Sequence, residues 1–236
     1  MQAVFISQGP IALSYPFVGR NLYTGKQSNG LTSDKGMNML GNPKKLMLVA
    51  LMGALGNAMF IVSQTIFKTS QIALDLSNIG TLVAAAYGGP WIGLLAGLVA
   101  GIGPGFYFGY LGGSLGLLGL IGLPIGKALT GLTVGYLMRT FKVNESGHAS
   151  WKMIAVTLIG YVPEALFTIV YFEVLVVILL PQVAMYLGSI HLFVLSLMIK
   201  AWIEMLFLGV FMGALGGNNG FKDFMRQHFI HLDKRQ

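Results

Sequence analysis

Five charged residues stand inside long apolar runs of this sequence, and their side chains are the ones best suited to chemistry. They are Lys127, Glu164, Glu173, Lys200 and Glu204. A charge at the centre of a membrane span costs roughly 2.5–3.5 kcal/mol on insertion scales, so such residues mark ligand contacts, proton relays or mutual ion pairs. The sequence therefore predicts a binding function or buried pairing at these five places.

The spacing of these charges leaves structural and functional interpretations open. Lys200 and Glu204 stand four residues apart on one expected helix and can neutralise each other. Lys127 and Glu164 are expected at similar depth in neighbouring spans, where they can form a cross-helix pair. Glu173 lies nearer the outer end of its span and has no obvious partner. Glu173 is thus the strongest single candidate for a ligand contact.

The usual signatures of enzymes and metal sites are missing from the sequence. There is no zinc-protease, serine-hydrolase or Walker A motif. There is also no cysteine, which excludes thiol catalysis and cysteine-ligated metal. His228 and His231 stand three apart in the tail without further ligands. We therefore expect no enzyme, no metal and no cofactor, and any action driven by ATP would need a separate subunit.

Composition and charge distribution indicate a membrane protein. Hydrophobic residues make up 55% of the 236 residues, charged residues 10%, and the mean hydropathy is +0.72. The net charge of +7 does not favour nucleic acid as a partner, because Lys and Arg flank the apolar runs: five precede residue 46, three fall within 139–152 and four follow residue 221. Such segments belong on the cytoplasmic side of a lipid bilayer.

The apolar runs predict an all-α integral membrane protein with six transmembrane helices and with both the N- and C-termini cytoplasmic. Residues 1–43 are expected to form a cytoplasmic N-terminal arm, 44–217 the six-helix membrane domain, and 218–236 an amphipathic, basic cytoplasmic tail. The expected spans are 45–67, 79–87, 91–108, 115–138, 153–180 and 187–215.

Small residues form two stripes. The first expected span carries Ala50, Ala54 and Ala58, and a second stripe has glycine at positions 93, 97, 101, 105 and 109. Residues four apart share one helix face, and small residues there let a neighbouring helix approach closely in lipid. We interpret the glycines chiefly as packing, while sliding of helices on a partner remains open. Asp75 and Asn78 are expected to cap the second span.

These features together resemble the substrate-binding S component of energy-coupling factor (ECF) transporters. The resemblance covers about residues 44–217 and rests on the alanine stripe, the segment LDLSNIGTLVAAAYGGPWIGLLAGLVAG and the six-span layout. It implies that Ala50, Ala54 and Ala58 dock on a transmembrane coupling subunit, which is linked to two ATPase subunits. The arm 1–43 is longer than the family needs and has no role assigned by the resemblance.

The resemblance also implies where a ligand would bind. In the family the ligand lies near the outer surface, among the last three spans and the outer connections. Carried over by place rather than by motif, the expected substrate-binding residues are Lys68, Gln71, Asp75, Tyr107, Glu173 and His191.

We therefore expect a multi-pass protein of the cell membrane that captures a vitamin-sized small molecule from outside as the S subunit of an ECF-type, ATP-driven importer. One alternative is a proton-coupled secondary transporter with Glu164, Glu173 and Lys127 as its relay. Many such carriers are built from two halves with similar sequences, and this sequence shows no such internal repeat. A second alternative is a membrane-embedded enzyme with Glu164 and His191 as acid and base.

Overall fold

The computed structural model describes residues 43–66, 75–111, 115–145, 148–186 and 189–230, and every regular element in these ranges is a helix. Five helices are long and apolar enough to cross a membrane. The chain is therefore an all-helical, multi-pass membrane protein, as its composition predicts. The five are α2 (Pro43–Ile66), the composite helix Pro90–Leu111, α6 (Gly116–Thr140), the composite helix Ala149–Leu179 and α10 (Ile190–Gly217).

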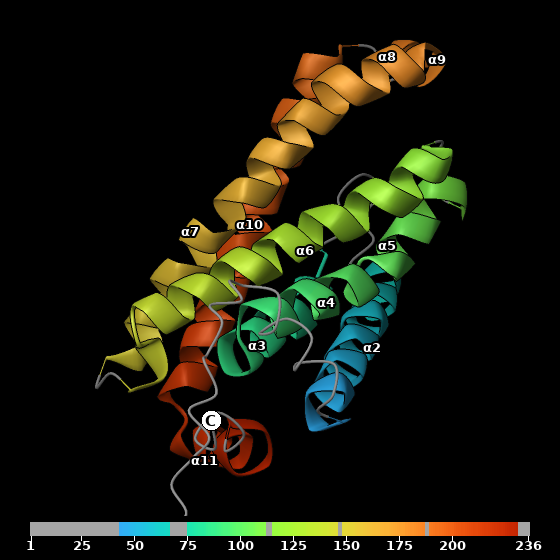
Figure 1. Cartoon of the computed structure of the whole chain (residues 1–236). Coiled ribbons are helices and arrows are strands. Elements are labelled where there is room, and N and C mark those ends of the chain that lie inside the picture. The colour runs from blue at the N-terminus through green and yellow to red at the C-terminus, as the bar shows by residue number, and fades with distance from the viewer. Residues whose placement is uncertain (1–42, 67–74, 112–114, 146–147, 187–188, 231–236) are drawn as a thin grey trace, which may run out of the picture.

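Both composite helices change to π-helix toward the same end of the bundle (Figure 1). Short π-helical segments are rare and occur often at functional sites. The first composite helix consists of α4 (Pro90–Ala100), α5 (Ile102–Phe106) and the π-helix η1 (Tyr107–Leu111). The second consists of α7 (Ala149–Val170), the π-helix η3 (Tyr171–Val176) and α8 (Val177–Leu179), after which α9 (Pro181–Tyr186) leads toward α10.

The expected span 79–87 is present as helix α3 (Asn78–Gly88), which has 11 residues. At 1.5 Å per residue it is about 16 Å long, roughly half of the ~30 Å hydrocarbon core. It is buried from Asn78 through Tyr87. The corner after it turns at Gly89, whose φ of 90° favours glycine. Helix α3 is thus a half-length, central helix, and six full spans are not confirmed.

Helix α6 runs through the middle of the molecule (Figure 1). On one side it packs against α3, α4 and α5, with α2 beyond them, and on the other side against α7, which pairs with α10. Toward the end that carries α8 and α9, the α7–α10 pair diverges from α5 and α6 (Figure 1). The elements therefore form two groups that are in close contact over only part of their length.

The glycine stripe of the third expected span faces α6, which confirms the packing interpretation. A Cβ added to any of these glycines would come within 2.3–3.0 Å of an α6 atom, so the two backbones are in direct contact. Dispersion forces of this kind hold helices together where lipid is as apolar as the side chains. The contacts are Gly93 with Gly131, Gly97 with Lys127, Gly101 with Pro124, Gly105 with Gly119 and Gly109 with Gly116.

Gly131→Ala is expected to destabilise the protein by about 1–3 kcal/mol, the usual effect of overpacking. The added Cβ would stand 2.1 Å from the Gly93 carbonyl oxygen. In the control Gly209→Ala the added Cβ meets nothing closer than 3.6 Å, and the better helix propensity of alanine leaves stability unchanged or slightly higher. Thermal unfolding in detergent, followed by tryptophan fluorescence, compares the two variants. Equal melting temperatures would contradict the close contact of α4 with α6.

The described parts of the three basic segments lie at one end of the bundle (Figure 1). These are the start of α2, the connection between α6 and α7 with its 3-10 turn η2 (Val143–Glu145), and the tail helices α11 (Asn219–Met225) and η4 (Arg226–Ile230). This common placement is what the charge rule for cytoplasmic segments requires. The expected arm 1–43 lies outside the described residues except for Pro43.

The amphipathic tail helix folds back onto the bundle. Met225 is 1% exposed, the Phe221 ring contacts the Tyr87 ring of α3 at a centroid distance of 5.5 Å, and Phe229 packs against the core. Phe224 of the same tail helix is 52% exposed. Much of the apolar face expected to lie on lipid instead covers the end of α3.

Candidate functional site

The buried charge of α6 is paired with the residue that leads into α3. The Lys127 ammonium lies 3.0 Å from Asp75 Oδ2 and donates a second hydrogen bond of 3.3 Å to Asn78 Oδ1. The other carboxylate oxygen of Asp75 accepts hydrogen bonds from the Ser77 backbone N–H and hydroxyl. The Lys127 side chain is 3% exposed. Lys127 therefore fixes the start of α3 near the midpoint of α6.

Helix α10 is tied to the same place. Glu204 Oε1 accepts a 2.7 Å hydrogen bond from the Asp75 backbone N–H and lies 3.5 Å from the Lys200 ammonium. The expected pairing of Lys200 with Glu204 is thus confirmed. Glu204 lies near the midpoint of α10, and it also holds the chain entering α3. Of the two expected caps of α3, Asp75 accepts a hydrogen bond from the backbone N–H of Ser77, the N-cap residue, whereas Asn78 lies inside the helix and accepts from Lys127.

The cross-helix pair expected between Lys127 and Glu164 does not form as an ion pair, since Lys127 pairs with Asp75. The Glu164 carboxylate instead accepts a hydrogen bond from the Thr130 hydroxyl of α6. Lys127 still interacts electrostatically with Glu164 and Glu204. We call Asp75, Asn78, Lys127, Glu164, Lys200 and Glu204 the central polar cluster.

The central polar cluster contains three carboxylates and two ammonium groups that come from four separate elements. Such groups inside a membrane bundle either stabilise the helices that carry them or handle protons and charged ligands. Within the described residues, no group of three or more His, Cys, Asp or Glu side chains is arranged to hold a metal ion. The contacts within the cluster are hydrogen bonds and ion pairs.

Two of the expected substrate-binding residues meet at the other end of the bundle. His191 Nδ1, at the start of α10, lies 3.2 Å from Glu173 Oε1 of the π-helix η3. Glu173 therefore has a partner that the sequence did not indicate. The His191 side chain is 76% exposed and that of Glu173 is 34% exposed, so both groups are open to a ligand.

The four expected substrate-binding residues that the structure describes do not form one site. Asp75 belongs to the central polar cluster, roughly 20 Å from His191 along α10 at 1.5 Å per residue. Tyr107 packs its ring edge-on against Phe60 of α2 at 5.6 Å. Lys68 and Gln71 lie outside the described residues. Among the four described residues, Glu173 and His191 are the two that the structure brings together.

The composite helix Ala149–Leu179 is joined to α6 by Tyr171, the first residue of η3. The Tyr171 hydroxyl donates a hydrogen bond to the Leu118 carbonyl oxygen, and its ring occupies the space that a side chain at Gly122 would need. Tyr171 thus packs between helices at the base of η3.

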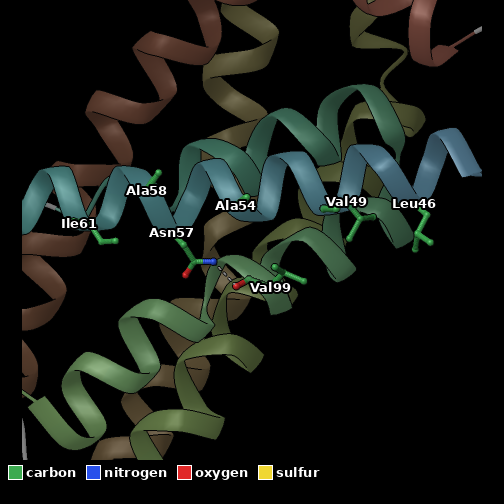
Figure 2. A pocket seen from close by; sticks show the side chains of 8 residues that line it. Leu46, Val49, Ala54, Asn57, Ala58, Ile61 and Val99 are labelled. Carbon is green, nitrogen blue, oxygen red and sulfur yellow. Dashed lines mark hydrogen bonds between the residues drawn. The ribbon is translucent and has the colours of Figure 1, made fainter.

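The alanine stripe lies on the face of α2 that points away from the bundle. Ala50, Ala54 and Ala58 are exposed, whereas Gly53 and Gly56 on the opposite face are buried against α4 and α3. The three alanines line an apolar groove on the outside of α2 and α4 (Figure 2). Its other lining residues are Leu46, Val49, Asn57, Ile61 and Val99.

The chain was compared with known proteins, and no protein-family model, no curated protein and no solved structure matches it.

Proposed function

We propose that this protein is the substrate-binding S subunit of an ECF-type importer, which captures a vitamin-sized small molecule outside the cell and delivers it inside. The observation that carries the proposal is the exposed alanine stripe on α2, because it lines an open apolar groove. A stripe of small residues lets another membrane helix approach closely without interlocking side chains. The groove is thus suited to the transmembrane coupling subunit of such an importer.

Helix α2 has small residues on two opposite faces, and this supports a docking role for the outer one. The inner face needs Gly53 and Gly56, where a Cβ would stand 2.5 and 2.6 Å from atoms of α4. The outer face meets no such contact within the described residues, so packing inside the chain does not require alanine there. A coupling subunit that binds the outer face gives those alanines a function.

The ligand is proposed to bind at the end where the α7–α10 pair separates from α5 and α6. Glu173 and His191 stand there with exposed side chains, and the aromatic residues of η1 lie on α2 and α5 at the same end. After docking, the bundle would rock as a body and turn this end toward the cytoplasm, powered by the two ATPase subunits. The extracellular orientation of this end is part of the proposal and agrees with the basic residues at the opposite end.

A proton-coupled carrier is the second candidate, and the central polar cluster is the observation that favours it. Asp75, Glu164 and Glu204 lie around Lys127 near the midpoints of α6 and α10, as carboxylates of proton relays do. The acid and base of an enzyme are less well supported. An enzyme would need Glu164 and His191 to act together, but each has a different partner. Glu164 accepts a hydrogen bond from Thr130, and His191 contacts Glu173, which follows Glu164 by nine residues in the chain.

The source of energy distinguishes the two candidates. Cells that express the chain with or without the coupling and ATPase subunits of the source organism are incubated with a mixture of water-soluble vitamins, and their contents are measured by mass spectrometry. We expect one compound to accumulate only when the ATPases are present, including after an ionophore has collapsed the proton gradient. Uptake by the chain alone that follows the pH gradient would replace the importer with the carrier.

A further inference from the structure

The side chain of Asn57 on α2 is inserted into the backbone of the neighbouring composite helix. Its Nδ2 donates a 2.8 Å hydrogen bond to the Val99 carbonyl oxygen (Figure 2). Its Oδ1 accepts a 2.7 Å hydrogen bond from the Gly103 N–H. Val99 and Gly103 are four residues apart, so in a continuous α-helix these two backbone groups would bond to each other. The Asn57 amide therefore takes the place of one backbone hydrogen bond.

The surroundings of the amide fit this insertion. A Cβ at position 103 would stand 2.4 Å from Asn57 Oδ1, so the insertion needs glycine there. Nδ2 also donates a 3.0 Å bond to the Gly53 carbonyl oxygen of its own helix, which directs the side chain toward Val99. Both donor hydrogens and the acceptor are thus used, and only this orientation of the amide satisfies all three partners.

The next backbone hydrogen bond of the same helix, from residue 104 to the Ala100 carbonyl oxygen, is missing as well. Pro104 has no N–H to donate to the Ala100 carbonyl oxygen. Two successive bonds are therefore absent, and the helix is interrupted at Gly101, between α4 and α5. Insertion of a side chain and proline are both known causes of helix kinks. Here the proline is fixed in the chain, whereas the amide belongs to another helix and can be withdrawn.

Withdrawal of the amide leaves no backbone group unsatisfied. The Val99 carbonyl and the Gly103 N–H can then bond directly, so a closed and an open form of the helix each satisfy the same two groups. The two arrangements satisfy the same backbone groups and differ in the partners of the Asn57 amide, so an occupant of the groove that displaces this amide shifts the population between them. Asn57 and Val99 both line the groove that carries the alanine stripe.

We propose that Asn57 is a positioning residue that holds the third span open at Val99–Gly103, and that filling the α2 groove moves the α5–η1 segment through it. Tyr107 and Phe108 of η1 both contact Phe60, one turn beyond Asn57 on α2, so the outer segment lies directly on the helix that carries the amide. We call Val99–Gly103 the hinge, and its assignment depends only on the hydrogen bonds of Asn57 to Val99 and Gly103. Only the identification of the occupant of the groove with a coupling subunit rests on the proposed function.

The hinge at Val99–Gly103 is tested by measuring the distance between two labels on the composite helix Pro90–Leu111, one on each side of the hinge. The chain has no cysteine, so Trp91→Cys and Tyr110→Cys, both exposed, place two spin labels specifically, and their separation is measured by pulsed electron spin resonance in lipid nanodiscs. The backbone of a straight helix between these residues would be about 29 Å long at 1.5 Å per residue. With Asn57→Ala we expect the distribution to narrow and move toward that of the straighter helix.

Two further variants keep this test independent of the folding of Asn57→Ala. Gly103→Ala leaves Asn57 in the chain but excludes its amide, and should give the same shift. Thr65→Ala is the matched control, because the Thr65 hydroxyl bonds only to Ile61 within α2, and it should leave the distance unchanged. The hinge is overturned if Asn57→Ala and Gly103→Ala both keep the original distribution, or if Thr65→Ala shifts it equally.

The connection to the groove is tested in the same labelled protein without any partner. Ala54→Trp fills the groove with an indole ring next to Asn57. We expect it to shift the label distance when Asn57 is present and to leave it unchanged in the Asn57→Ala background. An equal effect in both backgrounds would overturn the connection. Because no coupling subunit is used, failure here is distinguishable from failure of the proposed importer, which concerns uptake.

Discussion

Replacing Lys127 by methionine is expected to lower the free energy of unfolding by about 3–5 kcal/mol, because breaking a buried ion pair leaves the other charge uncompensated. Asp75 would lose its ammonium partner at 3.0 Å while remaining close to the carboxylates of Glu164 and Glu204. The start of α3 would then be held only by the hydrogen bond to Glu204. Reversible unfolding in mixed micelles, followed by tryptophan fluorescence, measures the loss.

Two variants show whether this loss comes from the ion pair. Lys127→Met combined with Asp75→Asn removes both charges, so most of the lost stability should return. Lys200→Met breaks a pair within one helix, and Glu204 keeps its hydrogen bond from the Asp75 N–H, so a smaller loss of stability is expected. A Lys127→Met protein as stable as the Lys200→Met protein would contradict the structural role of the pair.

Ala54→Trp is expected to reduce ATP-driven uptake at least about tenfold, which corresponds to a loss of about 1.4 kcal/mol or more in docking free energy. Ala54 lies in the middle of the alanine stripe and is exposed, so an indole there would separate two helices that have to pack closely. Folding and the proposed contacts of the ligand with Glu173 and His191 should be unaffected, because Ala54 is exposed on α2 and those two residues belong to η3 and α10. Uptake by cells that express the complete importer measures the effect.

The matched control for docking is Leu51→Trp. Leu51 is 54% exposed on the same helix but is not part of the groove, so the same large residue there should leave uptake unchanged. Equal uptake by the Ala54→Trp and wild-type proteins would remove the groove as a docking face. Equal loss in both tryptophan variants would show a general effect on α2.

Much of the fold could be predicted because its main signals are local. Apolar length predicts the long helices, and spacing by four predicts both the contact of the glycine stripe with α6 and the pairing of Lys200 with Glu204. The half-length of α3 was visible in the short run 79–87, but its central burial was not. A helix of 11 residues needs neighbours on all sides, and those neighbours come from distant parts of the chain.

The central polar cluster could be found only in part from the sequence. Lys127, Glu164, Lys200 and Glu204 stand out as charges within apolar runs, but Asp75 was assigned to the outer connection because it follows a polar stretch. Its pairing with Lys127 depends on the chain returning to the midpoint of α6 before α3 begins. The sequence offered Glu164 as the partner of Lys127, and the packing of the helices places Asp75 there instead.

Contacts made by amides gave no sequence signal at all. Asn57 is one polar residue in an apolar span, and its role depends on the register of α2 against α4, which hydrophobicity does not specify. The pairing of Glu173 with His191 likewise depends on the relative placement of η3 and α10. Both contacts join residues whose partners lie on different helices, where spacing rules do not apply.

The central claim, that this protein binds a small molecule for an importer, is tested most directly by mass spectrometry of compounds released when the detergent-purified full chain is denatured. We expect one vitamin-sized compound from the wild type, the same amount from Ala54→Trp, and none from Glu173→Ala, since Glu173 is proposed to contact the ligand and Ala54 only the partner. No compound from any of the three proteins, together with uptake driven by a proton gradient in liposomes that contain the chain alone, would contradict the claim and establish the carrier.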